Sequence, residues 1–169
     1  MTFRSGDVVL VDTNVIIEGY RTGCWKQLAQ FFKLHTVEKV IEETQTGFQN
    51  RDREQNIDQV TLIMSLAKVA PISEEQRATF NIKHNHPVLD AGERDLLIYA
   101  ETLSGAAWLL NTPDVAAVRF AANRDWMDRL VSLEAMIARL KCRLKENLAR
   151  NYTEKWLSEK KTWLLLNKS

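Results

Sequence analysis

"VVLVDTNVII", residues 8–17, is an almost wholly apolar stretch that is interrupted by one acid. The β-branched and leucine side chains of residues 8–11 are typical of a strand that is buried on both faces, as in a parallel sheet. Asp12 follows directly, and a carboxylate at the tip of a buried strand costs free energy unless a partner compensates its charge. Asp12 and Thr13 are also good helix N-caps, so this position alone has two interpretations.

Strands and helices alternate along the rest of the chain. Apolar runs predict short strands at 34–37, 68–72 and 106–111, with a fifth candidate at 129–133. A helix is expected at 57–67, with these residues facing the core: Ile57, Val60, Ile63, Met64 and Ala67. From residue 134 onward the whole segment looks helical. The alternation indicates an α/β fold with a mainly parallel sheet, in which the functional crevice lies outside the carboxyl ends of the strands.

The composition suits one globular domain with an uneven charge. The chain has 169 residues, of which 45% are hydrophobic and 27% charged, and a chain of this length can bury a core. The net charge of +1 hides an asymmetry, because residues 139–169 hold nine basic and three acidic residues (net +6) whereas residues 1–138 are net −5. An acidic body can gather cations, and a basic tail can meet phosphates.

Cysteine usage and hydropathy predict a cytoplasmic protein. The two cysteines, Cys24 and Cys142, are far apart in sequence, and we expect both to be free thiols in a reducing compartment. The first residues carry no apolar signal run, and no stretch approaches the length of a membrane span. We therefore expect no membrane contact.

Four acids occupy similar positions in the chain. Asp12 ends the first strand, and Asp114 follows the apolar run "WLLN". Glu43 lies on the helix after the second strand, and Asp95 lies inside the helix that begins after Asp90. Because the carboxyl ends of parallel strands meet at one edge of the sheet, we expect these four acids to converge.

Converging carboxylates need a cation. Two charges about 5 Å apart repel by roughly 3 kcal/mol at an effective dielectric of about 20. Mg²⁺ and Mn²⁺ prefer oxygen ligands and would remove this repulsion. Such ions suit phosphodiester hydrolysis, because they activate water and neutralise charge on the phosphate. A phosphatase with Asp12 as nucleophile is an alternative, but such enzymes usually carry a second acid two residues on, where this chain has Asn14.

The helical segments leave two choices of acid open. Glu42 competes with Glu43, because adjacent helical residues point about 100° apart. Glu93 competes with Asp95, because residues two apart do not share a helical face. We favour Glu43 and Asp95.

Four motifs together resemble the PIN-domain ribonucleases. They are "VDTNVII" at 11–17, "VIEETQTG" at 40–47, "LDAGERDLLIYAE" at 89–101 and "LLNTPDVAAV" at 109–118. The resemblance covers about residues 7–133. It implies a PIN-like three-layer α/β/α sandwich at 1–133, which a basic helical extension at 134–169 follows. It also implies a metal-dependent ribonuclease that holds one or two Mg²⁺ or Mn²⁺ ions, in a family that includes the toxins of bacterial toxin–antitoxin pairs.

The acids of the family carry over onto matching positions of this sequence. Asp12 matches the first aspartate of the family, and Glu43 matches the glutamate that precedes a glycine by four, here Gly47. Asp95 matches the central aspartate ahead of "LLIYA", and Asp114 matches the aspartate of the "T-x-D" turn, here "TPD". The resemblance therefore implies these four acids as catalytic metal ligands.

Neighbouring polar residues carry over as well. Thr13 and Asn14 match a small polar pair that helps to hold the first aspartate and the substrate phosphate. Thr112 matches a hydroxyl near the metal. Some members of the family carry "GE-x-D", which suggests that Glu93 matters alongside Asp95.

Two interpretations of the function stay open. In the first, the chain cleaves RNA, binds its backbone through basic side chains such as Arg119, Arg139 and Arg143, and has an antitoxin partner. Dimerisation through the C-terminal helices would accompany this function. In the second, the scaffold is non-catalytic and binds RNA or a protein through those basic helices.

Overall fold

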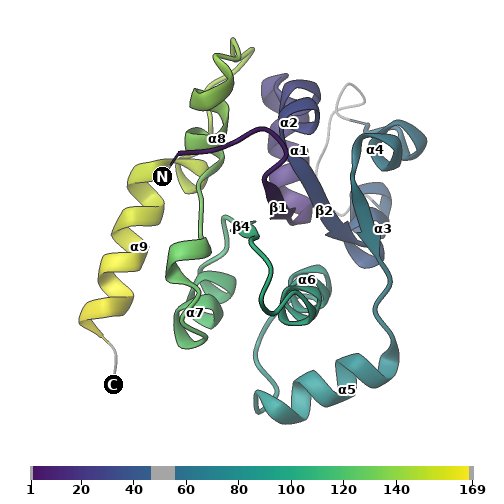
Figure 1. The fold of residues 1–169 in the computed structure, drawn as a ribbon, viewed down its shortest axis with the longest axis vertical. Helices are drawn as coiled ribbons and strands as arrows, with labels where there is room; N and C mark the ends of the chain where they lie inside the picture. The colour runs from purple at the N-terminus through teal and green to yellow at the C-terminus, as the bar shows by residue number, and fades with distance from the viewer. Residues whose placement is uncertain (1, 47–55, 168–169) are drawn as a thin grey trace.

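Four parallel strands form one sheet at the centre of the molecule (Figure 1). The structure is a computed structural model that describes residues 2–46 and 56–167. The strands are β1 (Val8–Val11), β2 (Lys33–Val37), β3 (Lys68–Ala70) and β4 (Leu109–Asn111). Their order across the sheet is β3-β2-β1-β4, and every pairing is parallel. This confirms the predicted α/β fold with a parallel sheet.

Strand β1 is the most buried strand, as its apolar sequence predicts. Val9, Leu10 and Val11 are at most 1% exposed. Val9 pairs with Leu34 of β2 on one side, and Val11 pairs with Asn111 of β4 on the other. β1 has a neighbouring strand on each side and helices over both faces, so it is shielded from water. Asp12, the residue that follows β1, is therefore buried as well.

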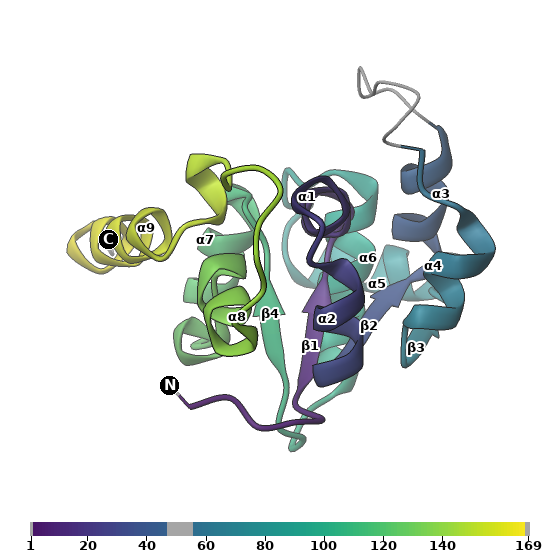
Figure 2. The ribbon, with the colours of Figure 1, turned by 90° about the horizontal axis from the view of Figure 1, so that it is seen from above.

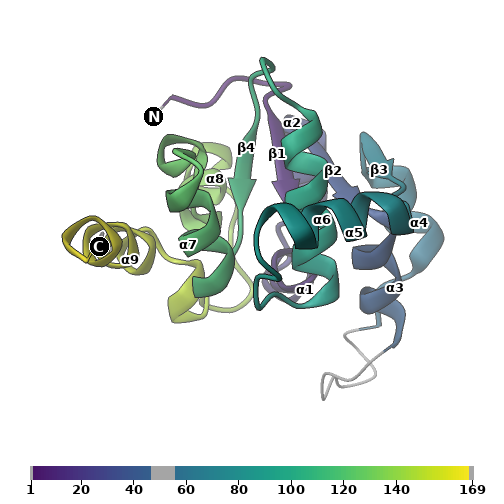
Figure 3. The same cartoon turned by 90° about the horizontal axis from the view of Figure 1, so that it is seen from below.

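Helices cover both faces of the sheet (Figures 2 and 3). Those before β4 are α1 (Thr13–Thr22), α2 (Trp25–Phe31), α3 (Glu38–Thr46), α4 (Gln59–Ser65), α5 (Glu74–Lys83) and α6 (Ala91–Thr102). α1 and α2 lie on one face, and α6 lies on the other. The chain moves outward from β1 to β3 and then returns past β1 to β4. Because crossovers are right-handed, this reversal places the returning helix on the opposite face. The predicted helix end at Gly47 lies outside the described residues.

The C-terminal elements pack onto the sheet domain. They are α7 (Val115–Asn123), the 3₁₀ helix η2 (Met127–Arg129), α8 (Leu133–Leu140), the 3₁₀ helix η3 (Arg150–Tyr152) and α9 (Glu154–Leu166). α8 packs against α2, and α9 packs against α7, so Met136 and Trp156 join the same hydrophobic core as β1. The fifth strand expected at 129–133 is reduced to a single bridge between Leu110 and Leu130. In the described part of the chain, none of the helices has the length and apolar character that a membrane crossing requires.

The continuous helix expected from residue 134 ends at Leu140. Lys141 adopts the left-handed conformation, with φ 53°, and stops the helix. Residues 141–152, which we call the strap, then run back along α1. The Lys145 N–H donates to Thr22 O at 2.9 Å, and the Ala149 N–H donates to Glu18 Oε1 at 2.9 Å. These donors bond to α1 instead of to their own preceding turn, so the helical spacing of the apolar residues does not produce a helix here.

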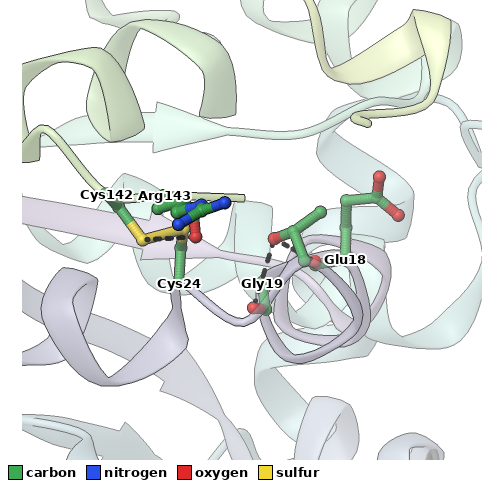
Figure 4. Close-up of a disulfide and its surroundings, with 6 residues drawn as sticks. Glu18, Gly19, Cys24, Cys142 and Arg143 are labelled. Carbon is green, nitrogen blue, oxygen red and sulfur yellow. Dashed lines mark hydrogen bonds between the residues drawn. A yellow bond between two sulfur atoms is a disulfide. The ribbon is translucent and has the colours of Figure 1, made fainter. Parts of the chain in front are cut away.

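The cysteine prediction is wrong. Cys24 and Cys142 form a disulfide with their Cα atoms 6.1 Å apart, although 118 residues separate them in sequence. Figure 4 shows the bond beside the end of α1, near Glu18 and Gly19, where it joins the start of α2 to the strap. The number of residues between two cysteines does not tell how far apart they lie in space. Here the packing of α8 against α2 brings the two cysteines together.

The expected inward face of the helix at 57–67 is wrong except at Ile57, which is buried just before α4 begins. In α4, Val60, Ile63 and Met64 are 65%, 42% and 81% exposed, whereas Leu62 is fully buried. This short helix packs against α2 and α3. α4 therefore carries more apolar residues than α2 and α3 cover.

Reduction of the disulfide should destabilise the fold. In the chain-entropy model, a cross-link that closes a loop of this length lowers the entropy of the unfolded chain and raises the free energy of unfolding by about 5 kcal/mol. Its loss corresponds to a fall in Tm of roughly 10 °C or more. Thermal melts with and without dithiothreitol measure it. The Cys24→Ser/Cys142→Ser double variant is the control, since it should melt low and ignore the reductant. Equal Tm values for the oxidised and reduced parent would contradict the cross-link.

Candidate active site

The topology brings two strand ends together at one place. β1 and β4 are neighbours, and the order of the strands reverses between them, because the chain runs from β1 to β2 and β3 before it returns to β4. Crevices in open α/β sheets form at such a point, outside the carboxyl ends of the strands. Val11 pairs with Asn111 as the last residue of each strand, so Asp12 and Thr112 emerge side by side.

Asp12 is buried and has no cationic partner among its hydrogen bonds. Its side chain is the N-cap of α1, where Oδ1 accepts the Val15 N–H at 2.9 Å, and Oδ2 accepts the Thr112 hydroxyl at 3.1 Å. Burial raises the pKa of Asp12 to about 7, with a smaller rise from the negative charges of Asp90 and Asp114. The two hydrogen bonds oppose that rise but do not cancel it. The structure therefore confirms the helix-cap interpretation of Asp12, and its raised pKa shows that burial of the carboxylate is compensated only in part.

Asp114 stands at the start of α7. Its Oδ1 accepts the Ala116 N–H at 2.6 Å, and its own N–H donates to the Thr112 hydroxyl oxygen at 3.2 Å. Thr112 thus receives a hydrogen bond from Asp114 and donates one to Asp12. This places Thr112 between the two acids, and its expected position near a metal stays a prediction.

Glu93, rather than Asp95, faces these acids. Burial, together with the smaller effect of the negative charges of Asp90, Asp114 and Asp12, raises the pKa of Glu93 to about 8. Glu93 belongs to a capping box at the start of α6, in which Asp90 Oδ1 accepts the Glu93 N–H at 2.8 Å. The four acids Asp12, Asp90, Glu93 and Asp114 therefore share one field of negative charge, which we call the acid cluster.

Asp95 points to a different partner. Its carboxylate accepts hydrogen bonds from Arg77 Nε at 3.0 Å and from Arg77 Nη2 at 2.6 Å, and Arg94 Nε approaches it at 3.4 Å. Asp95 is completely buried, so this bidentate ion pair compensates its charge. The structure therefore separates Asp95 from the acid cluster, because two residues along a helix turn the side chain to another face.

Glu43 is held at the rim of the acid cluster. Its Oε2 accepts the Thr13 hydroxyl at 2.5 Å, and its Oε1 accepts the Gly92 N–H at 2.9 Å in the first turn of α6. A Cβ at Gly92 would overlap the Glu43 carboxylate, so the absence of a side chain permits this approach. Glu42 is exposed and pairs with Lys39. Helical phase thus favours Glu43, as expected, and Thr13 binds Glu43 in addition to standing next to Asp12.

Three helix N-termini meet at the acid cluster. Asp12 caps α1, Asp90 caps α6 and Asp114 caps α7, each through a carboxylate that accepts a backbone N–H. The partial positive charge of each helix start favours a carboxylate by about 0.3–1 kcal/mol. These helix starts stabilise the acids in part, and the raised pKa values of Asp12 and Glu93 show that the compensation is incomplete.

Two residues at this place did not appear among the predicted site residues. Asp90 was expected only as a helix cap, although its position three residues before Glu93 is a capping-box signal that places both acids together. Tyr152 comes from the end of the strap, and its hydroxyl donates to the Asn14 carbonyl at 3.3 Å. Burial and the charges of Asp12 and Glu18 raise the pKa of Tyr152. No local pattern could place Tyr152 here, because only the path of the strap along α1 does so.

The three arginines proposed for RNA lie at separate places. Arg119 is exposed on α7, with its guanidinium over the Trp163 ring at 5.8 Å. Arg139 donates to Phe3 O at 3.4 Å and lies over the Phe31 ring. Arg143 is exposed on the strap. They do not form one patch, because α8 ends before Arg143 and turns Arg139 toward the N-terminal segment.

The donor set of the acid cluster fits a hard divalent cation. Carboxylate and hydroxyl oxygens are the ligands that Mg²⁺ and Mn²⁺ prefer. Within residues 2–46 and 56–167, no three Asp, Glu, His or Cys side chains already stand close enough to hold a metal ion. Rotation of the carboxylates toward one another is therefore needed to form a coordination shell. The mutual repulsion of the acids opposes that rotation until a cation is present.

Comparison of the chain with protein-family models, with curated proteins and with solved structures found no match.

The cation-free protein should lose stability as the pH rises from about 4.5 to about 8. Asp12 and Glu93 keep their protons in the folded state at pH values where the unfolded chain has lost them, so stability is greatest below the unfolded pKa and falls through the folded pKa. The slope reaches roughly 1.4 kcal/mol per pH unit for each group. Asp12→Asn keeps the helix cap and removes one of the two contributions. Urea unfolding in EDTA at several pH values should give a flatter profile for the variant. Parallel profiles for parent and variant would contradict the raised pKa of Asp12.

Gly92→Ala should disturb Glu43. Alanine is the better helix former by about 1 kcal/mol, so this change would stabilise α6 if space allowed it. Instead we expect a net loss of stability in the parent and a net gain in a Glu43→Ala background, where the overlapping carboxylate is gone. A double-mutant cycle by urea unfolding measures the difference. A gain in both backgrounds would show that Glu43 does not contact Gly92.

Proposed function

We propose that the chain is a metal-dependent ribonuclease with a PIN-like fold. The observation that carries this proposal is the acid cluster. Carboxylates from three separate parts of the chain lie where the sheet topology predicts a crevice, and within the described part of the chain no cationic side chain pairs with Asp12. We take the reaction of that cluster, metal-dependent cleavage of RNA, from the resemblance of the sequence to PIN-domain motifs.

The proposed ligand set differs from the one expected from the motifs. Asp12, Glu93 and Asp114 would hold Mg²⁺ or Mn²⁺, with Glu43 and Asp90 at the rim. Asp95 is left out, because Arg77 already compensates its charge. When bound, such a cation activates water for attack on phosphorus and neutralises the charge that develops on the phosphate.

The chain's own residues prepare the cluster for this role. Thr112 and the start of α1 fix the orientation of the Asp12 carboxylate. Thr13 and Gly92 fix Glu43. With pKa values of about 7 and 8, Asp12 and Glu93 change protonation near neutral pH, so protons and a cation compete for the same oxygens. The proposal therefore includes cation binding that tightens as the pH rises from about 6 to 8.

Cleavage of RNA tests the catalytic part of the proposal. Asp12→Asn and Glu93→Gln should each lower the rate of cleavage of a labelled single-stranded RNA in Mn²⁺ by roughly 100-fold or more, as loss of a central acid does in such sites. Asp95→Asn should keep cleavage per folded molecule while lowering the urea midpoint, because it breaks a buried ion pair.

Glu42→Gln is the matched control, since Glu42 is exposed and lies next to Glu43. It should cleave as the parent does. Full activity of Asp12→Asn would refute the proposed site, and loss of activity in Asp95→Asn with retained activity in Glu93→Gln would restore Asp95 as the ligand.

A metal titration separates the nuclease from the non-catalytic scaffold. Mn²⁺ at 100 times its dissociation constant should stabilise a binding protein by about 2.7 kcal/mol. We expect Tm to rise with Mn²⁺ at pH 8 for the parent and to rise much less for Asp12→Asn. A parent whose Tm ignores Mn²⁺ would support the scaffold instead.

A further inference from the structure

A groove of about 450 Å³ opens next to the acid cluster. One wall is the segment that leads into α6, with Val88 and Leu89, and the other is α7, with Ala116, Arg119 and Asn123. Leu89 directly precedes Asp90, and the Ala116 N–H donates to Asp114. Both walls therefore continue into acids of the cluster, so the groove and the cluster are parts of one surface.

The groove is cationic at one end and apolar on one side. Arg119 and Arg124 line it, and no Asp or Glu among the described residues does so. Val88 is 94% exposed, so its apolar surface is open to a ligand in the groove. Arg124 is held by Glu101 through Nη2 at 3.0 Å, while its buried Nε–H has no hydrogen-bond partner within residues 2–46 and 56–167. The Asn123 side chain adds both a donor and an acceptor to the lining.

A second groove is less suited to an anion. It has a volume of about 470 Å³ and is lined by Lys39, Arg77 and Arg94. The acids Glu42 and Glu74 line it too, and they pair with Lys39 and Arg77. Asp95 takes the remaining bonds of Arg77, so the positive charge of this groove is already compensated.

We propose that the groove between Leu89 and Arg119 binds one nucleotide of a single-stranded RNA, adjacent to the phosphate that the acid cluster acts on. Arg119 binds the backbone phosphate, Val88 and Leu89 contact the base or sugar, and Asn123 bonds to the base edge. The volume lies within the range of small-ligand sites. An unpaired base is required, because the base edges and faces of duplex RNA are not free to enter such a groove.

Trp163 extends the same surface away from the cluster. It comes from α9, is 49% exposed and lies against the Arg119 guanidinium. Aromatic faces beside arginine form stacking platforms for successive bases. This assigns Arg119, rather than Arg139 or Arg143, as the arginine that contacts RNA near the site.

This inference rests on the proposed function, but its test does not need cleavage. Binding of a fluorescein-labelled hexanucleotide of single-stranded RNA is measured by anisotropy in EDTA over a range of salt concentrations. Arg119→Gln should weaken binding several-fold and lower the slope of log K against log salt by about 0.7, as loss of one phosphate contact to a single strand does. Asn123→Ala should leave the slope of log K against log salt unchanged, because Asn123 contacts no phosphate. It should reduce the difference in affinity between hexanucleotides that each contain a single kind of base.

Lys39→Gln and Arg143→Gln are the matched controls, since each removes one positive charge away from the groove. Both should bind within twofold of the parent and keep its slope. Equal losses in these controls, or no saturable binding by the parent, would overturn the groove assignment. RNA binding that maps to Arg119 while Asp12→Asn cleaves as well as the parent would instead retain the groove and refute the nuclease site.

Discussion

The structure depends on how the chain accommodates a buried carboxylate at the end of its central strand. β1 is enclosed by two neighbouring strands, so Asp12 leaves the sheet with almost no access to water. Among the described residues, no arginine or lysine bonds to it. Its compensation comes from the start of α1, from the Thr112 hydroxyl and from the proton that its raised pKa lets it keep near pH 7. This incomplete compensation is the property that a divalent cation would use.

The same acids build the fold and define the site. Asp12, Asp90 and Asp114 each begin a helix by accepting a backbone N–H. Three helices therefore begin close together, at the place where the parallel strands end. Capping holds each carboxylate near the ends of the strands, and a cation would have to turn the carboxylates toward one another to complete a coordination shell. Helix capping and site geometry are therefore two effects of one arrangement.

The strap ties the C-terminal part of the chain to this arrangement. It runs from the Cys24–Cys142 disulfide along α1 and brings Tyr152 to the first turn of that helix. Arg21 extends the connection, because it binds Glu18 within α1 and both Glu146 and the Asn147 carbonyl on the strap. Displacement of the strap would release contacts along the whole length of α1, including those next to Asp12.

The sequence by itself determined the fold class, the central strand and most of the polar residues around it. Those features follow from local rules, since a β-branched run, a capping acid and a "TPD" turn act over a few residues each. It favoured Asp95 over Glu93, whereas in the structure Asp95 pairs with Arg77 and Glu93 lies in the field of the other acids. The disulfide, the strap and the exposed face of α4 depend on contacts between residues that are distant in sequence. Local spacing predicts which residues are apolar or capping, whereas the tertiary structure decides which neighbour each of them meets.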